Sequence, residues 1–254
     1  MTDYTDHHVP EGLRVRGTVV VVPGRGETRD TYARFGGRLA ADAYRVRVID
    51  PPLLDADDPA ATDDLASRIG DAVDGTAAGD GVVRPVVLVG ADAGAAAVAA
   101  LVTRGELPEG TRPDALVLAG LPGRAAGPAG TWDDELDVRT SCPTHRGTLT
   151  QDPRVRRGSL GEAVPDALLD AVQDGGIDVP VLLVTGDADS LADHEALERA
   201  AKSLPRARLS VVHSAHHDVL NDLQHRSVAA EVVTFLETLR NQLQPLVTVR
   251  SSAW

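Results

Sequence analysis

Apolar runs and helical stretches alternate along the chain in a regular way. Short runs rich in Val, Leu and Ile are typical of buried strands, and the stretches between them have the spacing of amphipathic helices. The pattern predicts strands at residues 18–22, 45–49, 86–89, 115–119, 181–185 and 209–212, and helices at 30–43, 60–73, 95–102, 193–203 and 227–242. Strands separated by helices indicate an α/β fold with a mostly parallel sheet covered on both faces.

One segment interrupts this alternation. Residues 121–177 contain many Gly, Pro and Arg residues and one short helical stretch at 163–172. An insertion of this size at one edge of a sheet is more typical of a functional cap or lid than of a plain loop. The length of 254 residues fits one α/β domain. We therefore expect a single domain over residues 1–254 with a small cap insertion at about 121–177.

Composition narrows the classes of partner. The net charge of −13 argues against a nucleic acid or an anionic membrane as the partner. The partner expected instead, from the candidate site described below, is a small-molecule substrate. The single cysteine, Cys142, cannot form an intramolecular disulfide. Residues 1–10 are polar without the apolar core of a signal peptide, and no apolar run is long enough to span a bilayer. These features favour a cytoplasmic protein and leave a homo-oligomer open.

The most informative stretch is residues 86–94, which read VVLVGADAG. A run of β-branched residues ends in the turn Gly90-Ala91-Asp92-Ala93-Gly94, and an Ala-rich helical stretch follows directly. Strand, tight Gly-x-X-x-Gly turn and helix form the pattern of a nucleophile elbow, whose glycines leave room for the helix to begin close to the strand. The apex residue of such an elbow is normally Ser. Here it is Asp92.

An acid and a histidine follow in the order expected of a catalytic triad. Asp187 and Asp189 come after the expected strand at 181–185, and His216 and His217 come after the strand at 209–212. The carboxyl ends of parallel strands are where an open α/β sheet gathers its site. The order and the strand context together are more specific than the elbow pattern alone.

The chain resembles the α/β-hydrolase fold over nearly its whole length, and within it the lysophospholipase and monoacylglycerol-lipase branch. The first loop of that branch, His-Gly-x-Gly-Glu, is similar to residues 23–27, PGRGE, with Pro in place of His. Its acid loop, Gly-x-x-Asp, matches residues 186–189 and selects Asp189 over Asp187. Its terminal His motif matches residues 217–222, HDVLND, and selects His217 over His216.

The resemblance also implies where a substrate and an oxyanion would bind. In this fold the oxyanion hole is made of backbone N–H groups from the first loop and from the residue after the nucleophile. Those positions are occupied here by Arg25 and Ala93. The substrate is expected between the carboxyl edge of the sheet and the cap, and the candidate binding residues are Gly24, Glu27, Trp132 and His145.

An aspartate at the apex changes the chemistry that the elbow can perform. A carboxylate suits displacement at a saturated carbon, because the intermediate is an alkyl ester that water can hydrolyse. In the resembled fold, Asp at this position marks haloalkane dehalogenases and epoxide hydrolases. Their usual helper groups are missing: Ala93 follows Asp92 where dehalogenases have Trp, and Tyr4, Tyr32 and Tyr44 all precede the cap. Asp92 is therefore expected to be a nucleophile or a general base.

The leading interpretation is a hydrolase of a small organic substrate, with Asp92 as nucleophile or base, His217 as acid and base, and Asp189 as the orienting acid. A position between two carboxylates would raise the pKa of His217 and favour its imidazolium form. A non-hydrolytic lyase or cyclase on the same fold is one alternative, and a catalytically inactive binding protein is another.

No cofactor and no metal are expected. The group His213, His216 and His217 resembles metal-ligand spacing, and the acids from Asp187 to Glu195 resemble a calcium loop, but neither has a complete ligand set. The Gly24-Arg25-Gly26 turn has Arg29 where a dinucleotide-binding loop needs its third glycine.

Overall fold

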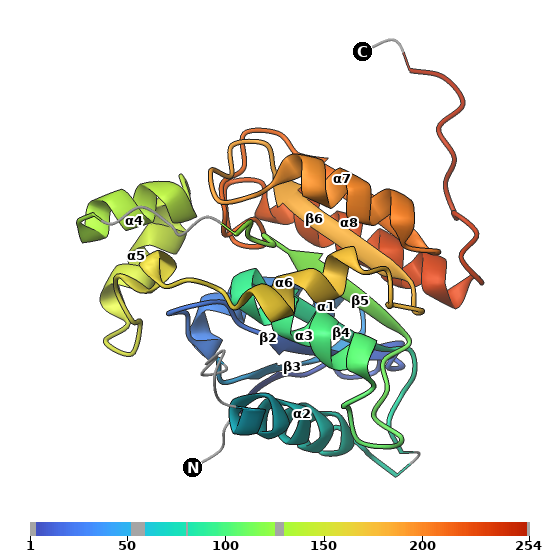
Figure 1. Cartoon of the computed structure of the whole chain (residues 1–254). Coiled ribbons are helices and arrows are strands. Elements are labelled where there is room, and N and C mark those ends of the chain that lie inside the picture. The colour runs from blue at the N-terminus through green and yellow to red at the C-terminus, as the bar shows by residue number, and fades with distance from the viewer. Residues whose placement is uncertain (1–3, 52–58, 80, 125–129, 253–254) are drawn as a thin grey trace.

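The centre of the molecule is a seven-stranded sheet with the strand order β1-β3-β2-β4-β5-β6-β7 (Figure 1). The structure is a computed structural model that describes residues 4–51, 59–79, 81–124 and 130–252. The edge strand β1 pairs antiparallel with β3, and every other pair is parallel. The strands are β1 (Tyr4–His7), β2 (Gly17–Val22), β3 (Tyr44–Ile49), β4 (Val86–Ala91), β5 (Ala115–Ala119), β6 (Val181–Gly186) and β7 (Ala207–Val212).

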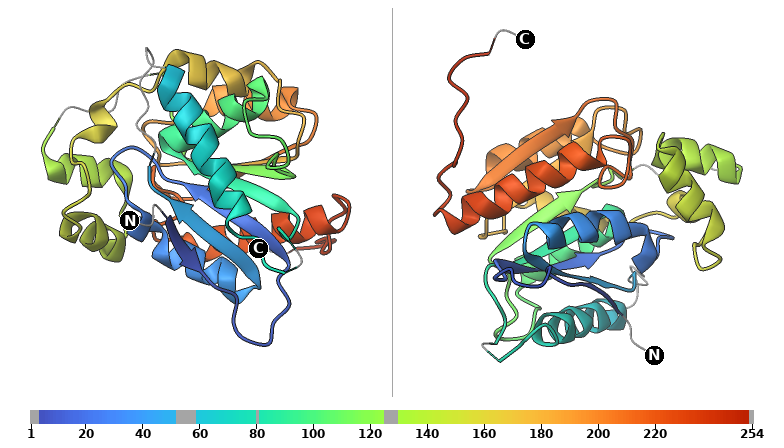
Figure 2. Two further views of the ribbon diagram at one scale, coloured as in Figure 1. Left: turned by 90° about the horizontal axis from the view of Figure 1, so that it is seen from below. Right: turned by 180° about the vertical axis from the view of Figure 1, so that it is seen from behind.

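Helices cover both faces of the sheet, as the alternating pattern predicts. One face carries α1 (Ala33–Ala41), which follows the short 3-10 helix η1 (Arg29–Tyr32), and α8 (His225–Arg240); both lie in front in the right panel of Figure 2. The other face carries α2 (Pro59–Asp74), α3 (Asp92–Arg104), α6 (Asp166–Gln173) and α7 (His194–Ser203). Among the described helices, none is long and apolar enough to cross a membrane.

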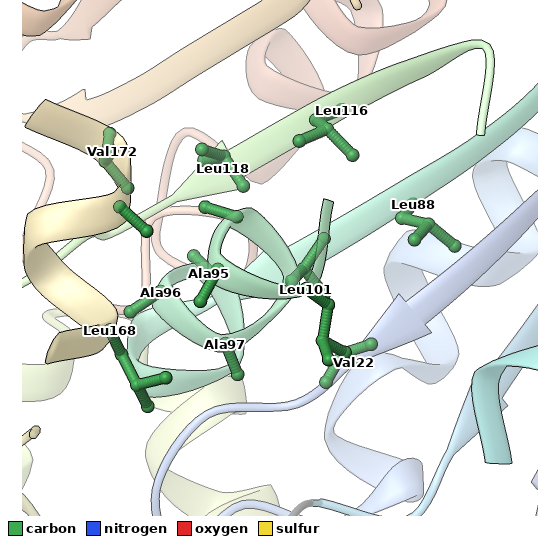
Figure 3. Packing of buried hydrophobic residues seen from close by; sticks show 14 of the residues in the cluster. Val22, Leu88, Ala95, Ala96, Ala97, Leu101, Leu116, Leu118, Leu168 and Val172 are labelled. Carbon is green, nitrogen blue, oxygen red and sulfur yellow. The ribbon is translucent and has the colours of Figure 1, made fainter. Parts of the chain in front are cut away.

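Alternation along the central strands explains how both faces become apolar. Val19 and Val21 of β2 pack in the cluster that contains α1 and α8, whereas Val20 and Val22 pack on the side of α3. Successive side chains of a strand point to opposite faces, so an unbroken run of valines serves two cores. Figure 3 shows the core on the side of α3, in which Ala95 of α3 and Leu118 of β5 belong to one hydrophobic cluster. The small alanine side chains let α3 lie close to the sheet.

The expected strands are confirmed, with small shifts at their ends. The strand β1 was not expected from its polar sequence, YTDH; as an edge strand it does not need two apolar faces. The helix expected at 95–102 begins earlier, at Asp92, so the apex residue is also the first residue of α3.

The segment 121–177 contains more helix than the sequence suggested. The expectation of one short helical stretch there is wrong, because α4 (Trp132–Arg139) and α5 (Pro143–Gln151) precede the short 3-10 helix η2 (Ser159–Gly161) and α6. The helices α4 and α5 are short and polar, so they lack the apolar stripe that reveals a helix. They lie beside the sheet, whereas α6 packs against α3 (Figure 1). Residues 125–129 of this segment lie outside the described residues.

Candidate active site

Asp92 stands at the tip of a strained turn between β4 and α3. Its φ angle is +48°, a left-handed conformation that side chains other than glycine rarely adopt. The flanking glycines are required by close approach. A Cβ on Gly90 would lie 2.5 Å from Cα of Ala95, and one on Gly94 would lie 2.4 Å from the carbonyl oxygen of Pro23. The turn therefore has the geometry of an elbow that presents the Asp92 carboxylate at the carboxyl edge of the sheet.

His217 lies between two carboxylates. Its Nε2 is 3.0 Å from Oδ1 of Asp92, and its Nδ1 is 3.0 Å from Oδ2 of Asp189. All three residues are buried, at 4% exposure or less. Asp189 is itself held in place, because its Oδ1 accepts a hydrogen bond of 2.9 Å from the backbone N–H of Leu191. The structure thus brings together three residues that lie 97 and 28 positions apart in the chain.

The neighbouring acid and histidine have other partners. Asp187 bonds Nδ1 of the exposed His213 at 2.9 Å, outside the buried site. The backbone N–H of His216 donates to Oδ2 of Asp222 at 2.7 Å, and its ring also lies against that carboxylate. The geometry therefore separates His217 and Asp189 from the two residues that the sequence placed beside them.

The charges of this group hold one another in place. Burial alone would lower the pKa of His217, but the charges and hydrogen bonds of Asp189 and Asp92 outweigh it and raise the pKa to about 10. Burial would raise the pKa of Asp92, yet hydrogen bonds and charge from His217 and Arg25 bring it well below its ordinary value. At neutral pH the resting site therefore contains an imidazolium between two carboxylates.

Arg25 contacts Asp92 with both its backbone and its side chain. The backbone N–H donates to Oδ2 of Asp92 at 2.8 Å. In the guanidinium, Nη2 lies 2.7 Å from Oδ1 and Nε lies 2.9 Å from Oδ2. The N–H expected to bind an oxyanion is thus bonded to the apex carboxylate itself. The remaining nitrogen, Nη1, donates to the carbonyl oxygens of Leu160 and Glu162 in the segment after α5.

Arg139 joins the helix α4 to the loops that carry this site. Its side chain is fully buried, and its Nη2 donates to the carbonyl oxygen of Arg25 at 2.7 Å and to Glu135 at 2.9 Å. The carbonyl oxygen of Arg139 in turn accepts from the backbone N–H of Asp218 at 2.8 Å. Sequence reasoning missed this residue. The acid four residues before it, Glu135, was the available signal of a paired arginine on a helix.

A second buried polar cluster lies beside the first. Oε2 of Glu27 accepts a hydrogen bond of 2.9 Å from the backbone N–H of Gly24 and another from the hydroxyl of Tyr32. Burial and the charge of Asp218 raise the pKa of Glu27 to about 7, although Arg139 acts in the opposite direction.

His145 belongs to this cluster rather than to an open binding surface. It is 1% exposed, and its Nε2 lies 2.8 Å from Oδ2 of Asp218. Among the described residues, Glu27, His145 and Asp218 form the one group whose ligand atoms are close enough to hold a metal ion, all within 4.8 Å of one another. The buried guanidinium of Arg139 already faces Asp218 at 3.4 Å, and its positive charge opposes a cation there. These residues therefore do not fit a metal site well.

Two cavities adjoin the elbow. The larger, of about 200 Å³, lies between the first loop and the segment before α6; it is lined by Pro23, Gly24, Arg25, Gly26, Glu27, Pro51, Ala93, Gly94, Arg154, Arg156, Glu162, Ala163, Val164 and Pro165. It contains four of the residues expected to bind substrate or an oxyanion. Trp132 does not line this cavity and packs with Leu136 and Leu149. The smaller cavity, of about 10 Å³, is lined by Asp92 and His217 among others.

The sheet order, the elbow and the buried His between two acids define a class of protein. Together they are the architecture of the α/β-hydrolase fold, with Asp in place of Ser at the apex. This chain has that fold.

Comparison with known proteins agrees at the level of the fold. Residues 163–243 match the family model of the TAP-like proteins, and no curated protein matches the sequence. The structure is similar to a monoacylglycerol lipase from Paleococcus ferrophilus, with a TM-score of 0.69 and 19% identity over 93% of this chain and 98% of the other. It is also similar to a soluble variant of monoglyceride lipase from Saccharomyces cerevisiae solved with a substrate analog, with a TM-score of 0.74 and 16% identity over 93% and 91%. A third similar structure is an enol-lactonase from Burkholderia xenovorans, with a TM-score of 0.66 and 17% identity over 92% and 95%.

Proposed function

We propose that this protein is a hydrolase of a small organic substrate, with Asp92 as the nucleophile, His217 as its acid and Asp189 as the orienting carboxylate. The observation that carries the proposal is the position of Asp92. A carboxylate at a strained apex, 3.0 Å from a histidine that a second carboxylate holds, is the arrangement of a nucleophile with its acid–base partner. The lipases and the lactonase of similar structure support hydrolysis as the reaction class.

The apex carboxylate favours a bond at a saturated carbon. An oxygen of Asp92 attacks that carbon, the bond to the leaving atom breaks, and the leaving atom takes the proton of the His217 imidazolium. The product is an ester of Asp92, whose second oxygen keeps the hydrogen bond from the backbone N–H of Arg25. Water then hydrolyses the ester and regenerates the carboxylate. The cavity of about 200 Å³ beside Arg25 and Ala93 supports a small substrate.

In this reading the segment 121–177 is a cap on a single domain. The side chain of Arg25 lines the larger cavity and contacts both the apex carboxylate and the segment 121–177. Its Nη1 donates to the carbonyl oxygens of Leu160 and Glu162 in that segment. Substrate must displace the Arg25 guanidinium from Asp92 before attack. Movement of residues 160–162 would release Arg25 at the same time.

The same ion pair favours a second candidate, a binding protein without catalysis. A carboxylate that is paired with a bidentate guanidinium, an imidazolium and a backbone N–H is fully satisfied and weakly nucleophilic. In that case the cavity of about 200 Å³ would bind a small molecule without turnover.

Turnover by the wild type and by Asp92→Asn separates the two candidates. The assay covers aryl esters, lactones, epoxides and haloalkanes, with Asp187→Asn as the matched control because Asp187 bonds the exposed His213. Hydrolysis predicts turnover that disappears in Asp92→Asn and persists in Asp187→Asn. It also predicts an ester on Asp92 that mass spectrometry detects when the wild type is quenched during turnover. Silence of the wild type across all four classes would favour the binding protein.

A further inference from the structure

The smaller cavity connects the two buried polar clusters. Its lining includes Glu27, Tyr32 and Asp218 of the second cluster and Asp92 and His217 of the first. The other lining residues are Ala91, Ala119, Val219, Leu220 and Asn221. Its volume of about 10 Å³ is the space that a single water molecule needs. A buried water also needs two to four polar partners, and this lining supplies carboxylates, a hydroxyl and an amide.

One residue of the lining has a buried polar atom that lacks a hydrogen-bond partner among the described residues. Asn221 is 2% exposed, and its Oδ1 accepts no hydrogen bond among the described residues. A buried acceptor without a partner costs about 1–3 kcal/mol, so native structures rarely leave one unsatisfied. A water molecule in the cavity that Asn221 lines would satisfy it.

Glu27 and Asp92 approach each other across Gly24. A Cβ on Gly24 would lie 3.1 Å from Oε2 of Glu27 and 3.1 Å from Oδ2 of Asp92. The two carboxyl groups are therefore near neighbours, although they belong to different loops. Their environments differ: Asp92 faces Arg25 and His217, whereas Glu27 faces the hydroxyl of Tyr32. Carboxyl groups whose environments separate their pKa values in this way commonly divide the acid and base roles of a site.

We infer that Glu27 is a second acid–base group of this site and that it exchanges its proton through one water molecule bound in the cavity between Glu27, Asp92, His217 and Asn221. Its role in the reaction rests on the proposed hydrolysis, in which this water attacks the Asp92 ester. Asn221 positions the water, and Glu27 accepts its proton.

The resting charges leave this role open to Glu27. The pKa of His217 is about 10 and that of Asp92 is far below neutrality, so neither group changes its protonation near pH 7. The pKa of Glu27 is about 7, within the range of an efficient general base at neutral pH. After His217 has given its proton to the leaving atom, the neighbouring carboxylate of Asp189 still favours the imidazolium form of His217. The imidazole therefore regains a proton from solvent.

The groups that face Glu27 come from four parts of the chain. Asp218 and the burial of Glu27 favour its neutral form, whereas the guanidinium of Arg139, the hydroxyl of Tyr32 and the ring of His145 favour its ionised form. Because these effects oppose one another, the pKa of Glu27 is higher than that of a free carboxylic acid, but not so high that the group stays protonated at every pH.

The hydrolytic step then balances. As the water oxygen bonds to Cγ of the Asp92 ester, one water proton passes to the Glu27 carboxylate and the carbonyl electrons move to the oxygen held by Arg25. When the carbonyl re-forms, the bond breaks between Cγ and the ester oxygen, which is the Asp92 oxygen that attacked the substrate. The departing alkoxide carries that oxygen away on the substrate carbon and takes the proton back from Glu27, while the water oxygen replaces it in the Asp92 carboxyl group. Asp92 is left as a carboxylic acid and loses its proton to solvent, which offsets the proton that His217 regained.

The first test needs no substrate. A high-resolution crystal structure is expected to show one water within hydrogen-bonding distance of Oδ1 of Asn221 and of Glu27. Infrared difference titration is expected to show the carbonyl band of a protonated carboxyl group that disappears near pH 7 and is absent from Glu27→Gln. The matched control is Glu195→Gln, whose side chain is 92% exposed and which should leave the band unchanged.

The second test uses a compound from whichever of the four assayed classes the wild type hydrolyses. Glu27→Gln is expected to form the Asp92 ester at the wild-type rate, accumulate it, and lose the rise of rate with pH around 7. Asn221→Leu, which removes the water's acceptor and keeps the side-chain volume, is expected to slow ester hydrolysis at least tenfold without changing ester formation. It also keeps the inference testable if Glu27→Gln does not fold.

Failure of this inference and failure of the proposed hydrolysis look different. An empty cavity, or a Glu27 that does not titrate between pH 5 and 9, overturns the inference even if the protein hydrolyses the panel. Wild-type ester hydrolysis in Glu27→Gln also overturns it and returns the base role to His217. A silent panel with an occupied cavity and a titrating Glu27 overturns the hydrolysis and leaves the acid–base site in place.

Discussion

The guanidinium of Arg25 lies against the carboxylate of Asp92, with Nη2 2.7 Å from Oδ1 and Nε 2.9 Å from Oδ2. The arginine side chain is 10% exposed and the aspartate side chain 5% exposed, so the pair is shielded from solvent. An apex carboxylate that is neutralised in this way is stable at rest and unreactive until the arginine moves. This relationship determines how the site responds to mutation.

Arg25→Gln should destabilise the fold and activate Asp92. Removal of one partner from a buried ion pair typically costs about 3–5 kcal/mol, and we expect a loss near the lower end because His217 still faces the carboxylate. Urea unfolding at pH 7 measures this loss. The rate at which an epoxide probe alkylates Asp92 should increase on the order of tenfold, the change that about 1.4 kcal/mol of barrier gives.

The double variant Arg25→Gln with Asp92→Asn provides the control. If the two groups interact as the distances indicate, the double variant should lose less stability than the sum of the single losses. Additive losses, together with an unchanged alkylation rate, would show that the ion pair does not restrain Asp92.

The raised pKa of His217 predicts a loss of stability at high pH. The folded-state pKa is about 10 and the unfolded value is 6.5, so the folded state binds the proton more tightly. The resulting stabilisation is fully present below about pH 6.5 and is lost as pH rises through 10. Urea unfolding between pH 6 and 10 should show a declining free energy of unfolding. The decline should be weaker in His217→Gln, and an equal decline in both proteins would contradict the raised pKa.

Two glycine substitutions should have opposite effects on stability. Gly94→Ala places a Cβ 2.4 Å from the carbonyl oxygen of Pro23 and 2.7 Å from that of Val22, so the backbone must move and the elbow distorts. Gly37→Ala, within α1, meets no atom within 4 Å and should stabilise the protein by about 0.5–1 kcal/mol, since alanine favours the helix. Thermal unfolding of the two variants measures the contrast. A tolerated Gly94→Ala would mean that the close approach of α3 to the end of β2 and the first loop is not required.

Arg139 is expected to couple the cap to the site. Arg139→Met removes the donor to the carbonyl oxygen of Arg25 and leaves Glu135 without its buried partner, at a cost of about 3 kcal/mol. Arg199→Met is the matched control. Its side chain is 66% exposed beside Glu195, and loss of such a surface pair costs less than about 1 kcal/mol. Equal effects in urea unfolding would mean that the Arg139 contacts do not hold the cap.

Hydrogen exchange adds a second readout for Arg139. If Arg139 ties α4 to the histidine loop, its loss should speed exchange of the backbone N–H of Asp218, which donates to the carbonyl oxygen of Arg139 at 2.8 Å. Unchanged exchange at Asp218 would limit the role of Arg139 to its own helix.

The sheet could be predicted because its signal is local. A run such as residues 19–22, VVVV, is buried on both faces of the sheet, and its pattern identifies a strand without knowledge of the rest of the chain. The elbow is also local, because Gly90, Asp92 and Gly94 lie within five residues and their sizes dictate the turn. The helices α4 and α5 could not be predicted in this way. They are short and polar, and α4 contacts loops that are distant in the sequence through Arg139, which bonds the carbonyl oxygen of Arg25.

By itself, the sequence determined the strand–helix order, the apex position of Asp92 and the loops that bring Asp189 and His217 to the same edge of the sheet. Each of these depends on residue spacing and on the rule that parallel strands end at one edge. Only the tertiary structure decided the surroundings of Asp92. The guanidinium of Arg25 pairs with its carboxylate, Arg139 bonds the carbonyl oxygen of Arg25, and Glu27 lines the same small cavity as Asp92. These residues come from separate parts of the chain. Side-chain contacts between loops depend on three-dimensional packing, and no spacing along the chain encodes them.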